Sequence, residues 1–137
     1  MRGLALPLTI ALAVSPASAM EQADSLAVRV AIEQQMTALQ RDDAQAAFAA
    51  AAPQLRQQFA DSESFMRMIH EQFPVIARPQ IVSFGDLRHT SYGLAQLLNL
   101  VDERGEPWIA LFLMDRGEDG VWRVANVVTV RLPSLPA

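Results

Sequence analysis

The feature of the sequence that most constrains its fold is a run of seven apolar residues, 108–114, which begins at Trp108 and ends at Met114. The run lies between Pro107 and Asp115 and is rich in aromatic and branched side chains. A short apolar run that is bounded by turn-forming residues is typical of a strand that is covered on both faces. We therefore expect this segment in the middle of a β-sheet.

Three further strands are expected around this run. Residues 94–101 precede it and residues 121–132 follow it, and both connecting segments contain the glycine and acidic residues of turns. Connections of this kind join antiparallel neighbours. Residues 81–88 have a mixed polar and apolar pattern that suits a strand at the edge of a sheet. The second half of the chain thus predicts a four-stranded antiparallel meander.

The first half of the chain predicts helices, of which the longest is amphipathic. Its apolar residues recur at spacings of four, four and three and form one stripe: Val28, Ile32, Met36 and Leu39. Asp24 or Ser25 is the expected N-cap. The glutamines beside the stripe, including Gln35, are expected mostly to face water.

Three shorter helices are expected to follow. Asp42 and Gln45 have the spacing of a capping box in front of an alanine-rich helix that runs to Ala52, and Pro53 suits the first position of the next helix. Asp61 is the expected start of a third helix.

That third helix should carry Phe65, Ile69 and Phe73 on one side and should end at Pro74. From Pro74 to Pro79 the chain is expected to run extended, as a crossing from the helices to the sheet.

Helices followed by strands predict an α+β fold, in which N-terminal helices pack on one face of a curved four-stranded antiparallel meander. This is the architecture of the cone-shaped, nuclear-transport-factor-2-like fold, and the cystatin-like arrangement is its close relative.

Residues 1–19 have the pattern of a signal peptide: a basic start at Arg2, an apolar stretch, and the small residues Ala17, Ser18 and Ala19 before the expected cut. The apolar stretch is too short to span a membrane. We therefore expect residues 20–137 to form a single secreted or periplasmic domain with no membrane span after cleavage. The chain contains no cysteine, which excludes a disulfide and a lipid-modified cysteine.

The charge and composition exclude several classes of function. The chain has a net charge of −4 and no basic stripe, which argues against nucleic acid or an anionic membrane as its partner. All of its basic residues are arginines, so Schiff-base chemistry on a lysine is excluded.

No reactive constellation stands out in the sequence, and we predict no catalytic residue, no metal site and no cofactor. The two histidines, His70 and His89, lack the spacing of metal ligands. The carboxylates Asp86, Asp102 and Asp115 fall at strand ends, where such groups are ordinarily solvated or cap turns.

One polar residue, Asn126, suggests a pocket. If Met114 pairs with Trp122, then Ala110 lies opposite Asn126, and an amide faces a small side chain beneath aromatic rings. The candidate pocket residues are Trp108, Phe112, Asn126 and Trp122. The alternative is that Asn126 marks a β-bulge or hydrogen-bonds the backbone.

The sequence resembles a family of small secreted bacterial domains, the domain-of-unknown-function family 4864. The resemblance extends over most of residues 28–128. The residues that carry it are Gln35, Ala38, Leu39, Asp42, Asp43, Ala47, Phe48, Pro53, Leu55, Phe59, Phe65, Phe73, Pro74, Arg78, Pro79, Phe84, Leu87, Trp108, Asp119, Gly120, Trp122 and Arg123. The resemblance implies a fold and a compartment, with no established activity to carry over.

These observations favour a non-catalytic module that binds a partner protein or a small apolar ligand. A small isomerase or hydrolase that uses an inward aspartate or histidine together with Asn126 is the alternative. A homodimer is also expected if the second apolar face of the central strand, formed by Ile109, Leu111 and Leu113, meets its own copy.

Overall fold

The computed structural model describes residues 3, 5, 7, 9, 10 and 15–133 of the 137-residue chain. Five helices come first in the described residues: α1 (Pro16–Gln40), α2 (Ala44–Ala49), α3 (Pro53–Arg56), α4 (Ser62–Gln72) and α5 (Pro74–Ala77). Four strands follow: β1 (Ile81–Thr90), β2 (Gly93–Val101), β3 (Pro107–Arg116) and β4 (Trp122–Arg131). No described helix has both the length and the hydropathy that a bilayer crossing requires.

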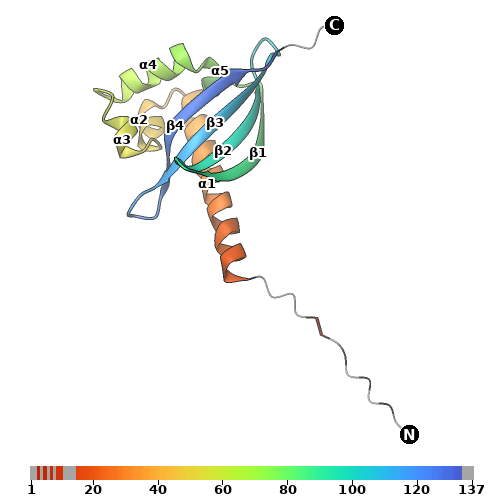
Figure 1. The fold of residues 1–137 in the computed structure, drawn as a ribbon. Coiled ribbons are helices and arrows are strands. Elements are labelled where there is room, and N and C mark those ends of the chain that lie inside the picture. Colours follow the sequence, from red (N-terminus) through yellow and green to blue (C-terminus); the bar gives the residue numbers. More distant parts are fainter. Residues whose placement is uncertain (1–2, 4, 6, 8, 11–14, 134–137) are drawn as a thin grey trace.

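The four strands form one antiparallel sheet in the order β1-β2-β3-β4, curved as Figure 1 shows. The predicted α+β class and meander are therefore confirmed. So are the interior position of β3 and the edge position of β1.

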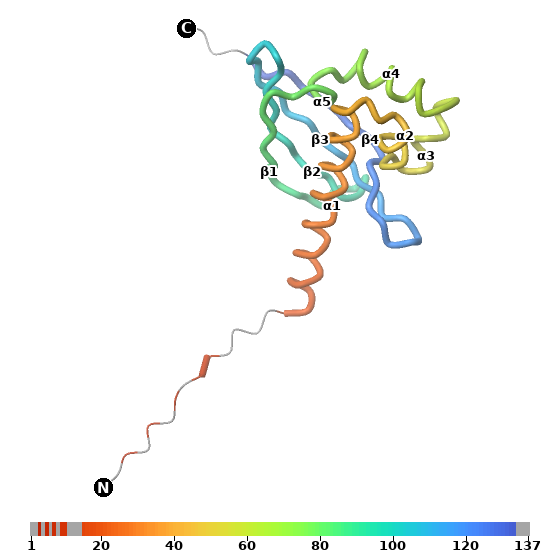
Figure 2. Tube along the Cα trace, turned by 180° about the vertical axis from the view of Figure 1, so that it is seen from behind, coloured from red at the N-terminus to blue at the C-terminus, as the bar shows by residue number. Residues whose placement is uncertain are grey.

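Helix α1 lies against the concave face of the sheet, as the view from behind in Figure 2 shows. The predicted stripe of Val28, Ile32, Met36 and Leu39 is buried there. Leu98, Ala110 and Phe112 from the sheet belong to the same core, and none of the three exposes any surface. The second half of α1 is thus the element around which the sheet curves, whereas its first turns extend away from the body of the domain (Figure 1).

Aromatic rings join the shorter helices to one another, and a cation–π contact joins α1 to the sheet. The ring of Phe65 on α4 lies 5.4 Å from the ring of Phe48 on α2 and 5.3 Å from that of Phe59. On the opposite side, the guanidinium carbon of Arg29 on α1 lies 4.5 Å above the ring of Phe84 on β1. The two ring contacts join α4 to α2 and to the segment after α3, and the Arg29 contact joins α1 to the β1 edge of the sheet.

Two predictions about α1 are wrong. The helix does not start at Asp24 or Ser25: it starts at Pro16, and Ser15 is the N-cap that accepts a hydrogen bond from the Ser18 N–H. Alanine and the other helix-compatible residues before Asp24 let the helix begin earlier. Gln35 does not face water: only 3% of its surface is exposed, and its Nε2 donates to the Ala47 carbonyl at 3.3 Å.

The start of α2 differs from the prediction by one residue. Asp43, not Asp42, is the N-cap, and its carboxylate accepts a hydrogen bond from the Ala46 N–H at 3.1 Å. Asp42 has a φ of 57° and forms the left-handed corner between α1 and α2.

The alanine-rich helix ends at Ala49 instead of Ala52 because the following backbone pairs with β4. The Ala52 N–H donates to the Val124 carbonyl at 2.8 Å, and the Val124 N–H donates to the Ala50 carbonyl at 2.9 Å. Part of the outer edge of β4 is thereby covered by main chain from the helical half.

The later helix boundaries follow the sequence, with one exception. Pro53 occupies the first turn of α3 and Asp61 is the N-cap of α4, as predicted. Asp61 also forms a capping box with Ser64, which was not predicted from the sequence. The chain after Pro74 is not extended: Pro74–Ala77 forms the short helix α5, because proline is well tolerated at a first helical position. Arg78, which precedes a proline, leaves the helical region as expected.

The register of the last hairpin differs from the predicted one in two ways. Trp122 pairs with Arg116 instead of Met114, a shift of two residues that keeps each side chain on its predicted face, and a bulge follows in β4. Leu113 pairs with Asn126 and Met114 pairs with Val124, so that Ala125 is an extra residue. A bulge moves every later side chain to the opposite face of the sheet. Val127 and Thr129 therefore face α1, while Asn126, Val128 and Val130 face outward.

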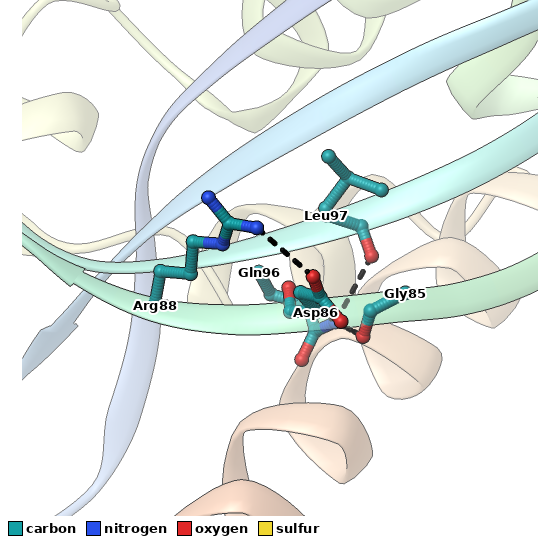
Figure 3. A network of polar contacts seen from close by, with 5 residues as sticks. All are labelled: Gly85, Asp86, Arg88, Gln96 and Leu97. Atoms are coloured by element: carbon teal, nitrogen blue, oxygen red, sulfur yellow. Dashed lines mark hydrogen bonds and ion pairs between the residues drawn. The ribbon is translucent and has the colours of Figure 1, made fainter.

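A second bulge lies in β1, where Gly85 and Asp86 together oppose Leu97 (Figure 3). The buried amide of Gln96 secures it, because its Nε2 donates to the carbonyls of Gly85 and Leu97, both at 2.9 Å. A Cβ at Gly85 would lie 2.7 Å from the Leu97 side chain, so glycine permits this close approach.

Candidate functional site

The four predicted pocket residues occupy separate places. Phe112 is fully buried in the core. Trp108 pairs with Arg131 at one end of the β3–β4 ladder, whereas Trp122 pairs with Arg116 at the other end. Asn126 is exposed on the outer face, where its own Oδ1 accepts a hydrogen bond from the Val127 N–H at 2.9 Å. The alternative, that Asn126 marks a bulge or hydrogen-bonds the backbone, is confirmed by its contact with the Val127 N–H, next to the bulge at Ala125.

The space between α1 and the sheet is filled by apolar side chains. Among the described residues, the buried polar side chains are Gln35 and Gln96, and both amides donate to main-chain carbonyls. The described residues contain no group of three or more histidine, aspartate or glutamate side chains that could hold a metal ion.

Two carboxylates predicted at strand ends have surface partners, although Asp86 lies at the bulge inside β1 and not at its end. Asp86 pairs with Arg88 at 3.1 Å, and Asp115 accepts a hydrogen bond from Gln54 of α3 at 3.2 Å. Asp119, in the β3–β4 turn, pairs with Arg123 at 2.8 Å, and this hydrogen-bonded partner lowers the pKa of Asp119 to about 2.

Asp102 organises the turn between β2 and β3. Its Oδ2 accepts a hydrogen bond from the Trp108 indole N–H at 2.8 Å. Its Oδ1 accepts from the backbone N–H groups of Arg104 and Glu106, both at 2.9 Å. These donors, the Trp108 indole first among them, hold the pKa of Asp102 below its usual value. The carboxylate therefore fixes both the turn and the orientation of the indole.

A hollow of about 550 Å³ lies between this turn and the α4–α5 corner. We call it the α5 hollow. Its apolar lining consists of Pro74, Val75, Ala77 and Trp108. Because the Trp108 indole N–H is already bonded to Asp102, the tryptophan offers the hollow the apolar surface of a fixed ring.

The rim of the α5 hollow is charged. Its arginines come from three separate segments, Arg78 after α5, Arg104 in the turn and Arg131 at the end of β4, and His70 of α4 lies beside them. Glu106 pairs with Arg131 at 3.2 Å. Asp42 contacts both His70, at 3.4 Å, and Arg78, at 3.8 Å.

The face of the sheet that points away from α1 is apolar and uncovered by the described helices. We call it the outer face. Its centre consists of Leu97, Ile109, Leu111, Leu113, Val128 and Val130. Val128 and Val130 expose 48% and 55% of their surface. Figures 1 and 2 place α1 on the opposite, concave face.

The prediction that β3 is covered on both faces is thus wrong within the described chain. Ala110, Phe112 and Met114 are buried beneath α1, whereas Ile109, Leu111 and Leu113 on the outer face are only half-buried.

Comparison with known proteins yields one family. The model of a family described as a domain of unknown function (DUF4864) matches residues 21–136. A search of curated proteins finds no match.

Proposed function

The chain belongs to the family described as a domain of unknown function (DUF4864), and for this member we propose a non-catalytic role: it binds a partner protein through the outer face of its sheet. The observation that carries the proposal is the exposure of Val128 and Val130 beside the half-buried Ile109, Leu111 and Leu113. A contiguous apolar surface of this kind marks an interaction site in soluble proteins.

The partner that we propose is a second copy of the chain. A two-fold dimer uses the same patch on both subunits, so that the patch must be compatible with itself. The centre of the outer face is aliphatic and uncharged, and it therefore meets its own copy without contact between like charges. The charged pair Asp86 and Arg88 lies near one end of the sheet, where it can form a polar rim.

The experiment is a measurement of molar mass in solution for the wild type and two variants. Val128→Arg places a charge in the centre of the outer face, and Tyr92→Arg changes an 86% exposed side chain in the β1–β2 turn. We expect twice the mass of one chain for the wild type and for Tyr92→Arg, and the mass of one chain for Val128→Arg. A wild-type protein that stays monomeric at high concentration contradicts the dimer.

The alternative role as an isomerase or hydrolase finds less support in this geometry. It requires an inward carboxylate or imidazole together with Asn126, yet Asn126 is on the outer face and the buried polar residues are two glutamines. The tightly filled core likewise gives no support to a small apolar ligand between α1 and the sheet.

We also propose that the protein is secreted or periplasmic and that residues 1–19 are removed. The first buried residue of α1 is Val28, so a cut after Ala19 would remove none of the buried side chains of this helix. N-terminal sequencing of the protein from the periplasmic fraction should give Met20 as the first residue. Recovery of the uncut chain from the cytoplasm would contradict this localisation.

A further inference from the structure

We propose that the α5 hollow binds a small planar carboxylate whose ring lies against Trp108 and whose carboxylate is drawn to Arg104 and Arg78. This site is separate from the outer face. The hollow lies beside α5 and the β2–β3 turn, and its volume of about 550 Å³ falls within the usual range for small-molecule sites.

The ring of the ligand is inferred from the apolar lining. Val75 and Ala77 are buried, and Trp108 is partly buried with its N–H bonded to Asp102 at 2.8 Å. A tryptophan whose donor is satisfied cannot hydrogen-bond a polar ligand. It contributes a flat apolar surface, which favours another planar ring.

The anionic group is inferred from which charges on the rim are already paired. Arg131 is held by Glu106 at 3.2 Å. Arg78 contacts Asp42 only at 3.8 Å, beyond hydrogen-bond length, and Arg104 has no ion-pair partner among the described residues. A guanidinium group binds a carboxylate through two parallel hydrogen bonds, so these two arginines are suited to that group.

The acidic residues of the hollow favour a ligand with no more than one negative charge. Three arginines line the hollow together with three acidic residues, Asp102, Glu103 and Glu106. Glu106 is paired with Arg131, whereas Asp102 accepts hydrogen bonds from uncharged N–H groups and keeps its negative charge. Asp102 and Glu103 therefore both repel an anionic ligand. A dianion such as phosphate would be repelled twice as strongly, and it has no apolar ring that could pack against Trp108.

The test is a titration of the full protein followed through its two indole N–H signals in nitrogen-15 NMR spectra, which Trp122→Phe assigns. Benzoate supplies a ring and a charge, benzamide only the ring, acetate only the charge, and inorganic phosphate a larger charge. We expect benzoate to shift the Trp108 signal saturably and to bind more tightly than the other three. The Trp122 signal lies at the other end of the β3–β4 ladder and should not move.

Three variants make the test specific. Arg104→Gln should weaken benzoate binding about threefold or more, and Glu103→Gln should strengthen it by a similar factor. Arg116→Gln removes an exposed arginine that pairs with Trp122, far from the hollow, and should leave binding unchanged. An unmoved Trp108 signal, equal binding of benzoate and benzamide, tighter binding of phosphate, or equal losses in Arg104→Gln and Arg116→Gln would each overturn the proposal.

Discussion

At the scale of single residues, two polar side chains hold main-chain geometry that the core alone would not specify. The Asp102 carboxylate accepts hydrogen bonds from the backbone N–H groups of Arg104 and Glu106 and from the Trp108 indole N–H. The buried Gln96 amide donates to the Gly85 and Leu97 carbonyls. The two residues differ in one respect that experiments can separate: the contribution of Asp102 depends on pH, and that of Gln96 does not.

Asp102→Asn should destabilise the protein in a pH-dependent way. The folded state lowers the pKa of this carboxyl from 3.8, so its stabilising effect is fully present above that value and is lost as the pH falls through the lower, folded value. Urea unfolding of both proteins should therefore show a constant difference near neutral pH that shrinks in acid below 3.8. Glu118→Gln, which removes an exposed turn carboxylate outside this hydrogen-bond network, is the control.

Gln96→Leu should lower the free energy of unfolding by about 1 to 3 kcal/mol, because the part-buried carbonyls of Gly85 in β1 and Leu97 in β2 lose their donor. Urea denaturation at pH 7 gives this value. Gln45→Leu, on the exposed side of α2, is the matched control and should change stability by less than about 0.5 kcal/mol. Equal effects of the two substitutions would show that the Gln96 amide does not secure the bulge.

At the scale of elements, the sequence predicts the four strands, the buried stripe of α1 and the start of α4, because each depends on a local period or cap. It does not predict the β4 bulge at Ala125. Apolar residues occur on both faces of this strand, so either register buries valines and the alternating pattern cannot choose between them. The bulge lies next to Val124, where the backbone of Ala50 and Ala52 pairs with the strand.

The burial of Gln35, like the β4 bulge, could not be predicted because it depends on a tertiary contact. Its partner, the Ala47 carbonyl, belongs to another helix, and a helical period carries no information about such a partner. The predicted pocket depended on the unbulged register, and the bulge places Asn126 on the outer face, away from the buried Phe112. Trp108 alone of the four lines the α5 hollow, whose other lining residues come from segments that only the tertiary fold brings together.

The two registers of β4 predict opposite outcomes for neighbouring valines. With the bulge, Val127 faces the core and Val128 is 48% exposed. Val127→Asn should therefore cost about 1 to 3 kcal/mol, whereas Val128→Asn should change stability by less than about 0.5 kcal/mol in the monomer. The free energies of unfolding of the two variants should be compared by denaturant unfolding at a protein concentration too low for self-association. A larger loss of stability in Val128→Asn than in Val127→Asn would instead support the register without the bulge.

At the scale of the whole molecule, the helices cover the concave face of the sheet, whereas no described helix covers the outer face. The same surface explains why β3 looks, in sequence, like a strand that is buried on both sides: its second apolar face is suited to a partner. In this account the fold supplies a rigid surface for association, and the α5 hollow adds a separate site at one end of the sheet.

The most direct test of this account is an isotope-filtered NMR experiment on protein mixed from labelled and unlabelled chains, which detects only contacts between copies. We predict contacts between methyl groups of the outer face, with Leu111 and Val128 of one chain close to the same face of its partner. An absence of contacts between copies, or contacts that arise only from surfaces outside the outer face, would contradict the account.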